Sequence, residues 1–101
     1  MWRRPAPVMI TQFVADRIGE YQRVARALRA AGIGAEVYPD AKKLGAQFQY
    51  AEKRGFQAAL IAGPDEFADG VWKVKDLAKR EEQTVSEAEL VPTLKRLIAH
   101  R

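Results

Sequence analysis

Three short apolar runs separated by two segments of helical periodicity most constrain what this chain can fold into. The runs span residues 8–14, 33–38 and 57–62, and their near-continuous apolar character is typical of strands buried on both faces. Between the runs, apolar residues recur every three or four positions, which predicts two amphipathic helices that end at Gly32 and Gly55. This alternation predicts parallel strands joined by right-handed crossovers.

The last third of the chain changes character and predicts a mixed sheet. Residues 71–75 alternate in polarity as a strand does, residues 84–85 form a second short strand, and the charged residues 79–82 form the turn between them. After these strands, Ser86 and the glutamate three residues later match a capping box that opens a C-terminal helix. Pro92 lies inside that helical pattern, so we expect it to kink the helix or delay its start.

The length of 101 residues fits one domain. Residues 1–7 contain two prolines and no periodicity, so we predict a linker or tail there and a single α/β domain over residues 8–101. The chain has no cysteine, which excludes disulfides, thiolate metal sites and cysteine nucleophiles and favours a reducing, cytoplasmic setting. No apolar run approaches the roughly 20 residues that a membrane-spanning helix needs, so we expect no membrane partner.

Nothing in the sequence predicts catalysis. The single histidine, His100, is the penultimate residue, where a catalytic triad could not hold its geometry. No glycine-rich phosphate loop follows the first apolar run, and no residues stand at metal-ligand spacing. We therefore expect no catalytic residue, no metal and no cofactor in this chain.

The second predicted helix, about residues 41–54, carries the features that suggest a binding surface. The chain has a net charge of +4, and this segment holds four basic residues against one acid. Spacings of four, three and four residues predict one polar stripe along the helix, formed by Lys43, Gln47, Tyr50 and Arg54 and broadened by Lys42, Gln49 and Lys53. Cations, an amide and an aromatic ring supply the contacts that single-stranded RNA requires. The alternative is a helix face that is merely solvated.

The segment from Gly63 to Gly70 follows the third apolar run, and carboxyl ends of strands are where open α/β sheets place their sites. Glu66 could accept hydrogen bonds from the amino groups of bases, and Lys75 could reach a phosphate or a base edge. The alternative is an acidic turn in which Asp65 and Glu66 cap a short helical turn.

The chain also resembles a known family in several segments. Residues 43–55 have the sequence Lys-Leu-Gly-Ala-Gln-Phe-Gln-Tyr-Ala-Glu-Lys-Arg-Gly, followed by Gln-Ala-Ala-Leu-Ile-Ala-Gly-Pro-Asp-Glu at 57–66 and Val-Lys-Asp-Leu at 74–77. Together with Leu-Arg-Ala-Ala-Gly-Ile at 28–33, this succession is similar to the C-terminal anticodon-binding domain of bacterial histidyl-tRNA synthetases, which are class IIa synthetases. The likeness covers about residues 8–99.

The resemblance implies a fold and a set of contacts. The fold would be a single three-layer domain, with a five-stranded mixed sheet flanked by three main helices. Gln47, Tyr50 and Lys53 match the helix motif of the family, while Glu66 and Lys75 fall where class IIa relatives carry base-contacting residues. We assign base edges to Gln47 and Glu66 and stacking to Tyr50. The remaining expected contacts are phosphate contacts by Lys42, Lys43, Lys53 and Arg54.

The resemblance further implies a tRNA anticodon-loop binding module, most simply the excised C-terminal domain of a histidyl-tRNA synthetase. Such a module would be monomeric and not catalytic by itself, and its partners would be the anticodon stem-loop and the catalytic domain of the parent enzyme. ATP and histidine would bind that catalytic domain. Two other hypotheses are a freestanding paralogue that binds a protein or RNA in general, and a small-molecule site at the carboxyl edge of the sheet.

Overall fold

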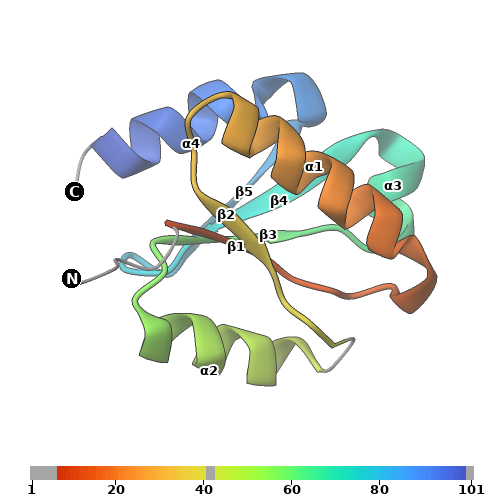
Figure 1. Cartoon of the computed structure of the whole chain (residues 1–101), viewed down its shortest axis with the longest axis horizontal. Helices are drawn as coiled ribbons and strands as arrows, with labels where there is room; N and C mark the ends of the chain where they lie inside the picture. Colours follow the sequence, from red (N-terminus) through yellow and green to blue (C-terminus); the bar gives the residue numbers. More distant parts are fainter. Residues whose placement is uncertain (1–6, 41–42, 100–101) are drawn as a thin grey trace.

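A five-stranded mixed sheet lies at the centre of the molecule, in the order β2-β1-β3-β4-β5, and helices cover both of its faces (Figure 1). This computed structural model describes residues 7–40 and 43–99. The strands are β1 (Val8–Ile10), β2 (Ala35–Val37), β3 (Ala58–Ile61), β4 (Val71–Asp76) and β5 (Glu81–Ser86). The helices are α1 (Ile18–Ala30), α2 (Leu44–Arg54), α3 (Pro64–Asp69) and α4 (Leu90–Ala99), and two 3-10 turns are η1 (Ala15–Arg17) and η2 (Glu87–Glu89).

The strand directions agree with the sequence-based expectation. β1 pairs in parallel with both β2 and β3, whereas β3 with β4 and β4 with β5 are antiparallel. α1 and α4 lie on one side of the sheet and α2 on the other, which gives three layers (Figure 1). The predicted α/β class and five-stranded mixed sheet are therefore confirmed.

The predicted helix ends are confirmed where glycine determines them. Gly32, just after α1, and Gly55, just after α2, have φ values of 86° and 81°, a left-handed conformation that favours glycine. Pro92 falls in the first turn of α4, where a missing backbone N–H costs no helical hydrogen bond, and the preceding residues form η2. The proline thus delays the start of the α-helix, as predicted.

Several predicted boundaries are wrong. The first strand ends at Ile10 rather than residue 14, and residues 64–69, for which no helix beyond a short turn was considered, form the helix α3. The turn predicted at residues 79–82 is shorter in the structure, because Glu81 and Glu82 already belong to β5. Ser86 does not form the predicted capping box: its hydroxyl donates to the Glu89 carboxylate at 3.2 Å instead of bonding the backbone.

The two faces of the sheet are packed differently. Under α1 and α4 lies a large apolar cluster that includes Tyr21, Trp72 and Leu94, all buried. Under α2 lies a smaller cluster, whose buried members are Met9, Ala51, Phe56, Ala59 and Leu77. Within residues 7–40 and 43–99, no helix is both long and apolar enough to span a bilayer.

Candidate nucleic-acid interface

Gln47, predicted to contact base edges from an exposed stripe, lies inside the protein. Its side chain has 0% relative exposure. Its Oε1 accepts a hydrogen bond from the backbone N–H of Gln12 at 2.8 Å, and its Nε2 donates to the backbone carbonyl of Gln12 at 2.9 Å. The placement of Gln47 on the surface is therefore wrong, and its amide joins α2 to the segment that follows β1.

Helix geometry explains this correction. Leu44, Gln47 and Ala51 are separated by three and four residues, which is the spacing of the inward face of a helix. The sequence-based interpretation assigned Gln47 to the polar stripe because its spacing of four residues from Lys43 and three from Tyr50 fits that face equally well. The spacing of Leu44, Gln47 and Ala51 was the one signal in the sequence for burial of Gln47. A buried glutamine also needs hydrogen-bond partners, and these lie outside the helix.

The exposed cations of α2 lie at its two ends. Lys43 is the residue just before the helix, and Lys53 and Arg54 form its last turn, so about 16 Å of helix separates the two groups. All three side chains are exposed, as predicted. Lys42 lies outside the described residues.

Tyr50 is only half-buried and is already part of an aromatic cluster. Its ring meets the ring of Tyr38 edge-on at 5.1 Å between centroids and lies 6.4 Å from that of Phe56. The Arg54 guanidinium carbon lies 5.4 Å from the centre of the Tyr50 ring, within range of a cation–π contact. A base could therefore reach only the part of Tyr50 that this cluster leaves exposed.

Lys75 lies beside α2, where the structure brings it together with the helix. On β4, Trp72 and Val74 belong to the core under α1 and α4, so Lys73 and Lys75 belong to the opposite, α2-facing side. The Lys75 ammonium lies 4.1 Å from the centre of the Phe48 ring. This cation–π contact holds the amine at the edge of the helix.

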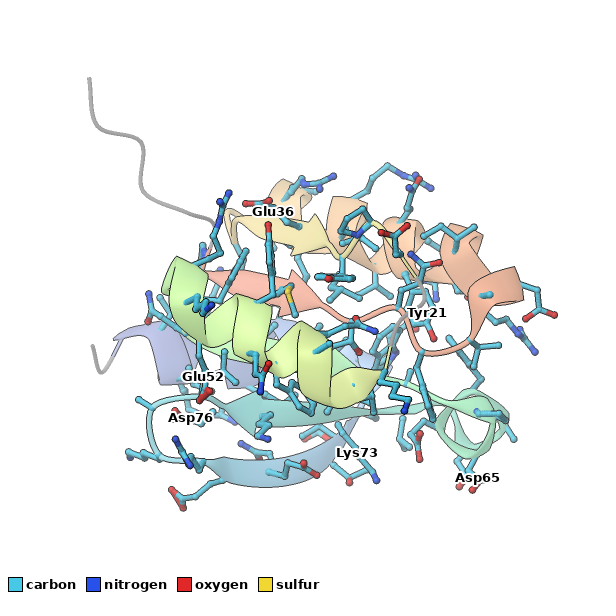
Figure 2. The ribbon with its side chains drawn as sticks, turned by 90° about the horizontal axis from the view of Figure 1, so that it is seen from below. Tyr21, Glu36, Glu52, Asp65, Lys73 and Asp76 are labelled. Atoms are coloured by element: carbon cyan, nitrogen blue, oxygen red, sulfur yellow. The ribbon has the colours of Figure 1, made fainter. Side chains whose placement is uncertain are left out.

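Lys73 joins this region although the sequence did not single it out for binding. The register places Lys73 opposite Ile61 of β3 and Thr84 of β5. Figure 2 shows β4 and β5 beside α2 rather than beneath it, with Lys73 on this open part of the sheet. The alternation of Lys73 and Lys75 with two core residues was the signal that could have found it.

Glu66 belongs to α3 and caps that helix. Its Oε1 accepts the backbone N–H of Gly63 at 2.7 Å, so the capping alternative considered from the sequence describes this contact correctly. Pro64 occupies the first position of α3, where its fixed φ suits a helix start. A carboxylate has two acceptor oxygens, and this bond uses one of them.

Buried side chains also fix the segment after β1. The Tyr21 hydroxyl donates to the carbonyl of Ala62 at 2.7 Å and accepts the backbone N–H groups of Phe13 and Val14 at 3.3 and 2.9 Å. Burial raises the pKa of this hydroxyl above its usual value of 10, although the bonds from the two N–H groups act in the opposite direction. The phenol therefore stays neutral and keeps donating across the neutral pH range.

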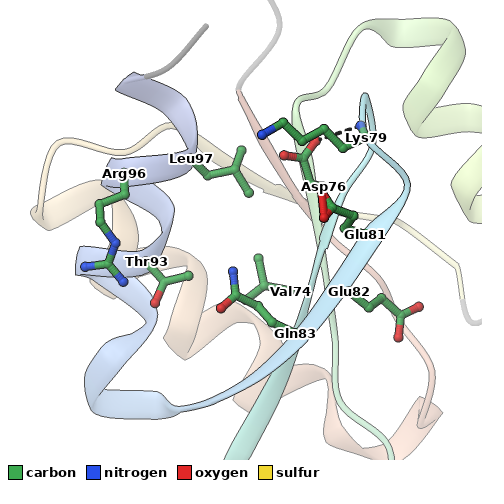
Figure 3. A pocket seen from close by; sticks show the side chains of 9 residues that line it. All are labelled: Val74, Asp76, Lys79, Glu81, Glu82, Gln83, Thr93, Arg96 and Leu97. Atoms are coloured by element: carbon green, nitrogen blue, oxygen red, sulfur yellow. Dashed lines mark hydrogen bonds between the residues drawn. The ribbon is translucent and has the colours of Figure 1, made fainter.

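A cavity of about 490 Å³ lies away from these residues, between α4 and the hairpin of β4 and β5 (Figure 3). The carboxylates of Asp76, Glu81 and Glu82 line it together with Lys79 and Arg96. None of the predicted RNA-contacting residues that the structure describes lines this cavity. Three carboxylates disfavour a phosphate backbone, so the cationic side of β4 is the better candidate for nucleic acid.

Comparison with known proteins agrees with this geometry. The sequence profile of the family described as "Anticodon binding domain" matches residues 8–97. The chain belongs to the anticodon-binding domain family. It is 45% identical over 83 residues to the histidine–tRNA ligase of Rhodopirellula baltica, a match that covers 82% of this chain and 19% of that protein. The corresponding match in Xanthomonas oryzae is 42% identical over 86 residues and covers 85% of this chain and 18% of the ligase.

A solved structure is also similar to this chain. The histidyl-tRNA synthetase from Nostoc sp. PCC 7120 superimposes with a TM-score of 0.90 at 33% identity, over 93% of this chain and 23% of that chain. This anticodon-binding domain thus spans about a fifth of the length of the relatives it matches.

Proposed function

We propose that this anticodon-binding domain binds the anticodon loop of tRNA, and that the preferred tRNA is histidine tRNA. The observation that carries the proposal is the position of Lys73 and Lys75 on the open side of β4, beside a helix whose exposed cations stand at both ends. Family membership supports RNA as the ligand. Within residues 7–40 and 43–99, we find no feature that favours a protein partner or a small molecule over RNA.

In this proposal the cations attract and orient the phosphate backbone. Lys43, Lys53 and Arg54 lie along α2, and Lys75 is held beside it by Phe48, so their charges act along one side of the molecule. Glu66 accepts hydrogen bonds from base amino groups, and Tyr50 offers the exposed part of its ring. Gln47 has no direct contact in this scheme because it is buried.

The histidine–tRNA ligases that this chain resembles support a role for it inside a larger protein. We propose that the chain acts within a histidine–tRNA ligase, where it helps to select the tRNA and where ATP and histidine bind a separate catalytic domain. Such a role implies a cytoplasmic location. This chain itself supplies binding and orientation rather than chemistry.

The proposal is tested by fluorescence anisotropy with a labelled anticodon stem-loop of histidine tRNA and the same hairpin with a scrambled loop. We expect tighter binding of the native loop, and we expect the affinity for both hairpins to fall steeply with salt. Salt-sensitive binding without loop preference would contradict anticodon recognition, and no binding at low salt would overturn the proposal altogether.

Lysine variants locate the surface. Lys75→Ala should weaken binding to both hairpins and reduce the slope of log affinity against log salt by about one, because one phosphate contact is lost. Lys95→Ala is the matched control, since Lys95 belongs to α4 on the opposite side of the sheet. An equal loss in the two variants would show that the RNA does not prefer the α2 side.

A further inference from the structure

The anticodon-binding domain exposes the aromatic ring of Phe13, which belongs neither to the apolar core nor to the polar stripe predicted on α2. Phe13 is 48% exposed, and Ile18, at 37%, is the other large apolar side chain prominently exposed in the described part of the chain. Phe13 lies in the segment that follows β1, at the edge of the sheet where β1 and β3 end. Exposure of one apolar residue is ordinary on a protein surface, so its immediate surroundings decide what it means.

The main chain under Phe13 is held in place from both sides. The residue before it, Gln12, has its N–H and carbonyl bound by the buried Gln47 amide. The N–H groups of Phe13 itself and of Val14 donate to the buried Tyr21 hydroxyl. Three consecutive residues are therefore fixed by side chains from α2 and α1, and the ring projects from a rigid base.

The ring also packs against Gly63, which has no side chain to interfere. A Cβ at position 63 would lie 2.6 and 2.7 Å from Cε2 and Cδ2 of Phe13, far inside normal contact distance. Gly63 has a φ of −103°, which any residue can adopt, so its backbone does not require glycine. The close approach of the Phe13 ring is the feature that a side chain at this position would disrupt.

Groups that recognise nucleotides lie beside the ring and on the neighbouring segments. The same Cβ position at residue 63 lies 3.1 Å from Oε1 of Glu66, which places this carboxylate next to Phe13. Lys73 lies opposite Ile61, two residues before Gly63, and Lys43 lies one helical turn before Gln47. An aromatic face with a carboxylate acceptor next to it, on a segment whose neighbours carry two lysines, matches an unpaired base with its amino group and phosphates.

We propose that Phe13 is a stacking surface for an unpaired base of the bound RNA loop. This inference rests on the proposed function and adds a contact residue and its mode of contact. Gln47 and Tyr21 act as positioning residues that hold the main chain of the Phe13 segment, and Gly63 leaves room for the ring. The base stacks on the exposed part of the ring while Glu66 and Lys73 contact its edge and backbone.

Substitutions of Phe13 test the inference in the whole 101-residue chain with the labelled histidine anticodon stem-loop. Phe13→Ala should weaken binding about 5- to 150-fold, the range found when base–aromatic stacking is removed. Phe13→Tyr keeps a π face and should bind like the wild type, whereas Phe13→Leu keeps apolar volume only and should lose affinity. The salt slope should stay unchanged in all three variants, because no phosphate contact is removed.

Ile18→Ala is the matched control for exposed apolar area and should leave affinity unchanged. Gly63→Ala should weaken binding, because the added methyl group forces the exposed Phe13 ring away from its position against the main chain of residue 63. Abasic substitutions at each loop position should reveal one position whose loss weakens the wild type but no longer matters in Phe13→Ala.

The outcomes separate this inference from the proposed function. If Phe13→Ala binds the hairpin as tightly as the wild type does, Phe13 is not a stacking surface, but the anticodon-loop proposal still stands. Failure of Phe13→Tyr to bind, or an equal loss in Ile18→Ala, also overturns stacking. If the wild type binds no hairpin, both proposals are wrong.

Discussion

The two faces of the sheet differ in how much apolar surface they bury and in how polar their outer residues are. Under α1 and α4 the strands contribute a large apolar surface around the buried, hydrogen-bonded Tyr21 hydroxyl, and the ion pair between Arg23 and Glu87, at 2.8 Å, lies on the rim. Under α2 the apolar cluster is small, a glutamine is buried at its side, and β4 carries two lysines. One face holds the domain together, and the other combines modest packing with a polar surface.

This difference shows how a domain of this size can carry a binding surface. Apolar burial on one side supplies most of the stability, since its free energy scales with the area removed from water. The α2 side can then keep cations exposed and use buried hydrogen bonds to fix geometry. Stability and binding should therefore respond to different substitutions.

The largest expected effect comes from truncating the same residue type in the two outer layers. Leu94→Ala in α4 removes a side chain with 0% exposure and should lower the free energy of unfolding by about 2–5 kcal/mol. Leu44→Ala in α2 should cost less, because Leu44 is only half-buried. Urea denaturation of both variants measures the difference, and an equal cost would remove the contrast between the faces.

A smaller loss is expected from the buried glutamine. Gln47→Ala leaves the N–H and carbonyl of Gln12 without their side-chain partner and should lower the free energy of unfolding by about 1–3 kcal/mol. Gln49→Ala is the control, because Gln49 is exposed on the same helix and should change stability by no more than about 0.5 kcal/mol. If the two variants are equally stable, the Gln47 amide is not structural.

The smallest effect belongs to the rim of the apolar face. Hydrogen bonds from Arg23 lower the pKa of Glu87, so this carboxylate stabilises the fold at pH values above its ordinary pKa of 4.5, and that contribution is lost as the pH falls below it. Both side chains are nearly half exposed, so Glu87→Gln should cost less than about 1 kcal/mol at pH 7.

The pH dependence tests the same pair. The difference between the wild type and Glu87→Gln should shrink as thermal unfolding is followed from pH 7 down to pH 3. Glu89→Gln, in the same 3-10 turn, is the control. A cost for Glu87→Gln as large as that for Gln47→Ala would contradict the ranking of exposed ion pairs below buried amide bonds.

The sequence predicted the fold better than the site, for a physical reason. The α/β class and the mixed sheet follow from the apolar runs and the helical periodicity, which record burial averaged over whole elements. The ends of single elements were less predictable: residues 11–14 continue the apolar run but leave the ladder after Ile10. Their hydrogen bonds go to Leu60 and Gln47, which lie 49 and 35 residues further along the chain, and to the side chain of Tyr21.

The site residues divide in the same way. Exposure of Lys43, Lys53 and Arg54 could be predicted, because long charged side chains rarely leave water. Burial of Gln47 could not, because its partners belong to Gln12, 35 residues earlier. The RNA-binding roles of the three cations remain predictions, which the hairpin experiments test.

The sequence by itself determined the α/β class and the order of the five strands and three main helices along the chain. It also determined the helix ends at Gly32 and Gly55, because glycine adopts a left-handed backbone without steric cost. Tertiary structure alone decided that Gln47 is a buried tether and that Phe13 is exposed against Gly63. A polar side chain can be buried only where distant backbone groups meet it, and an apolar ring stays exposed where the main chain beneath it is already fixed.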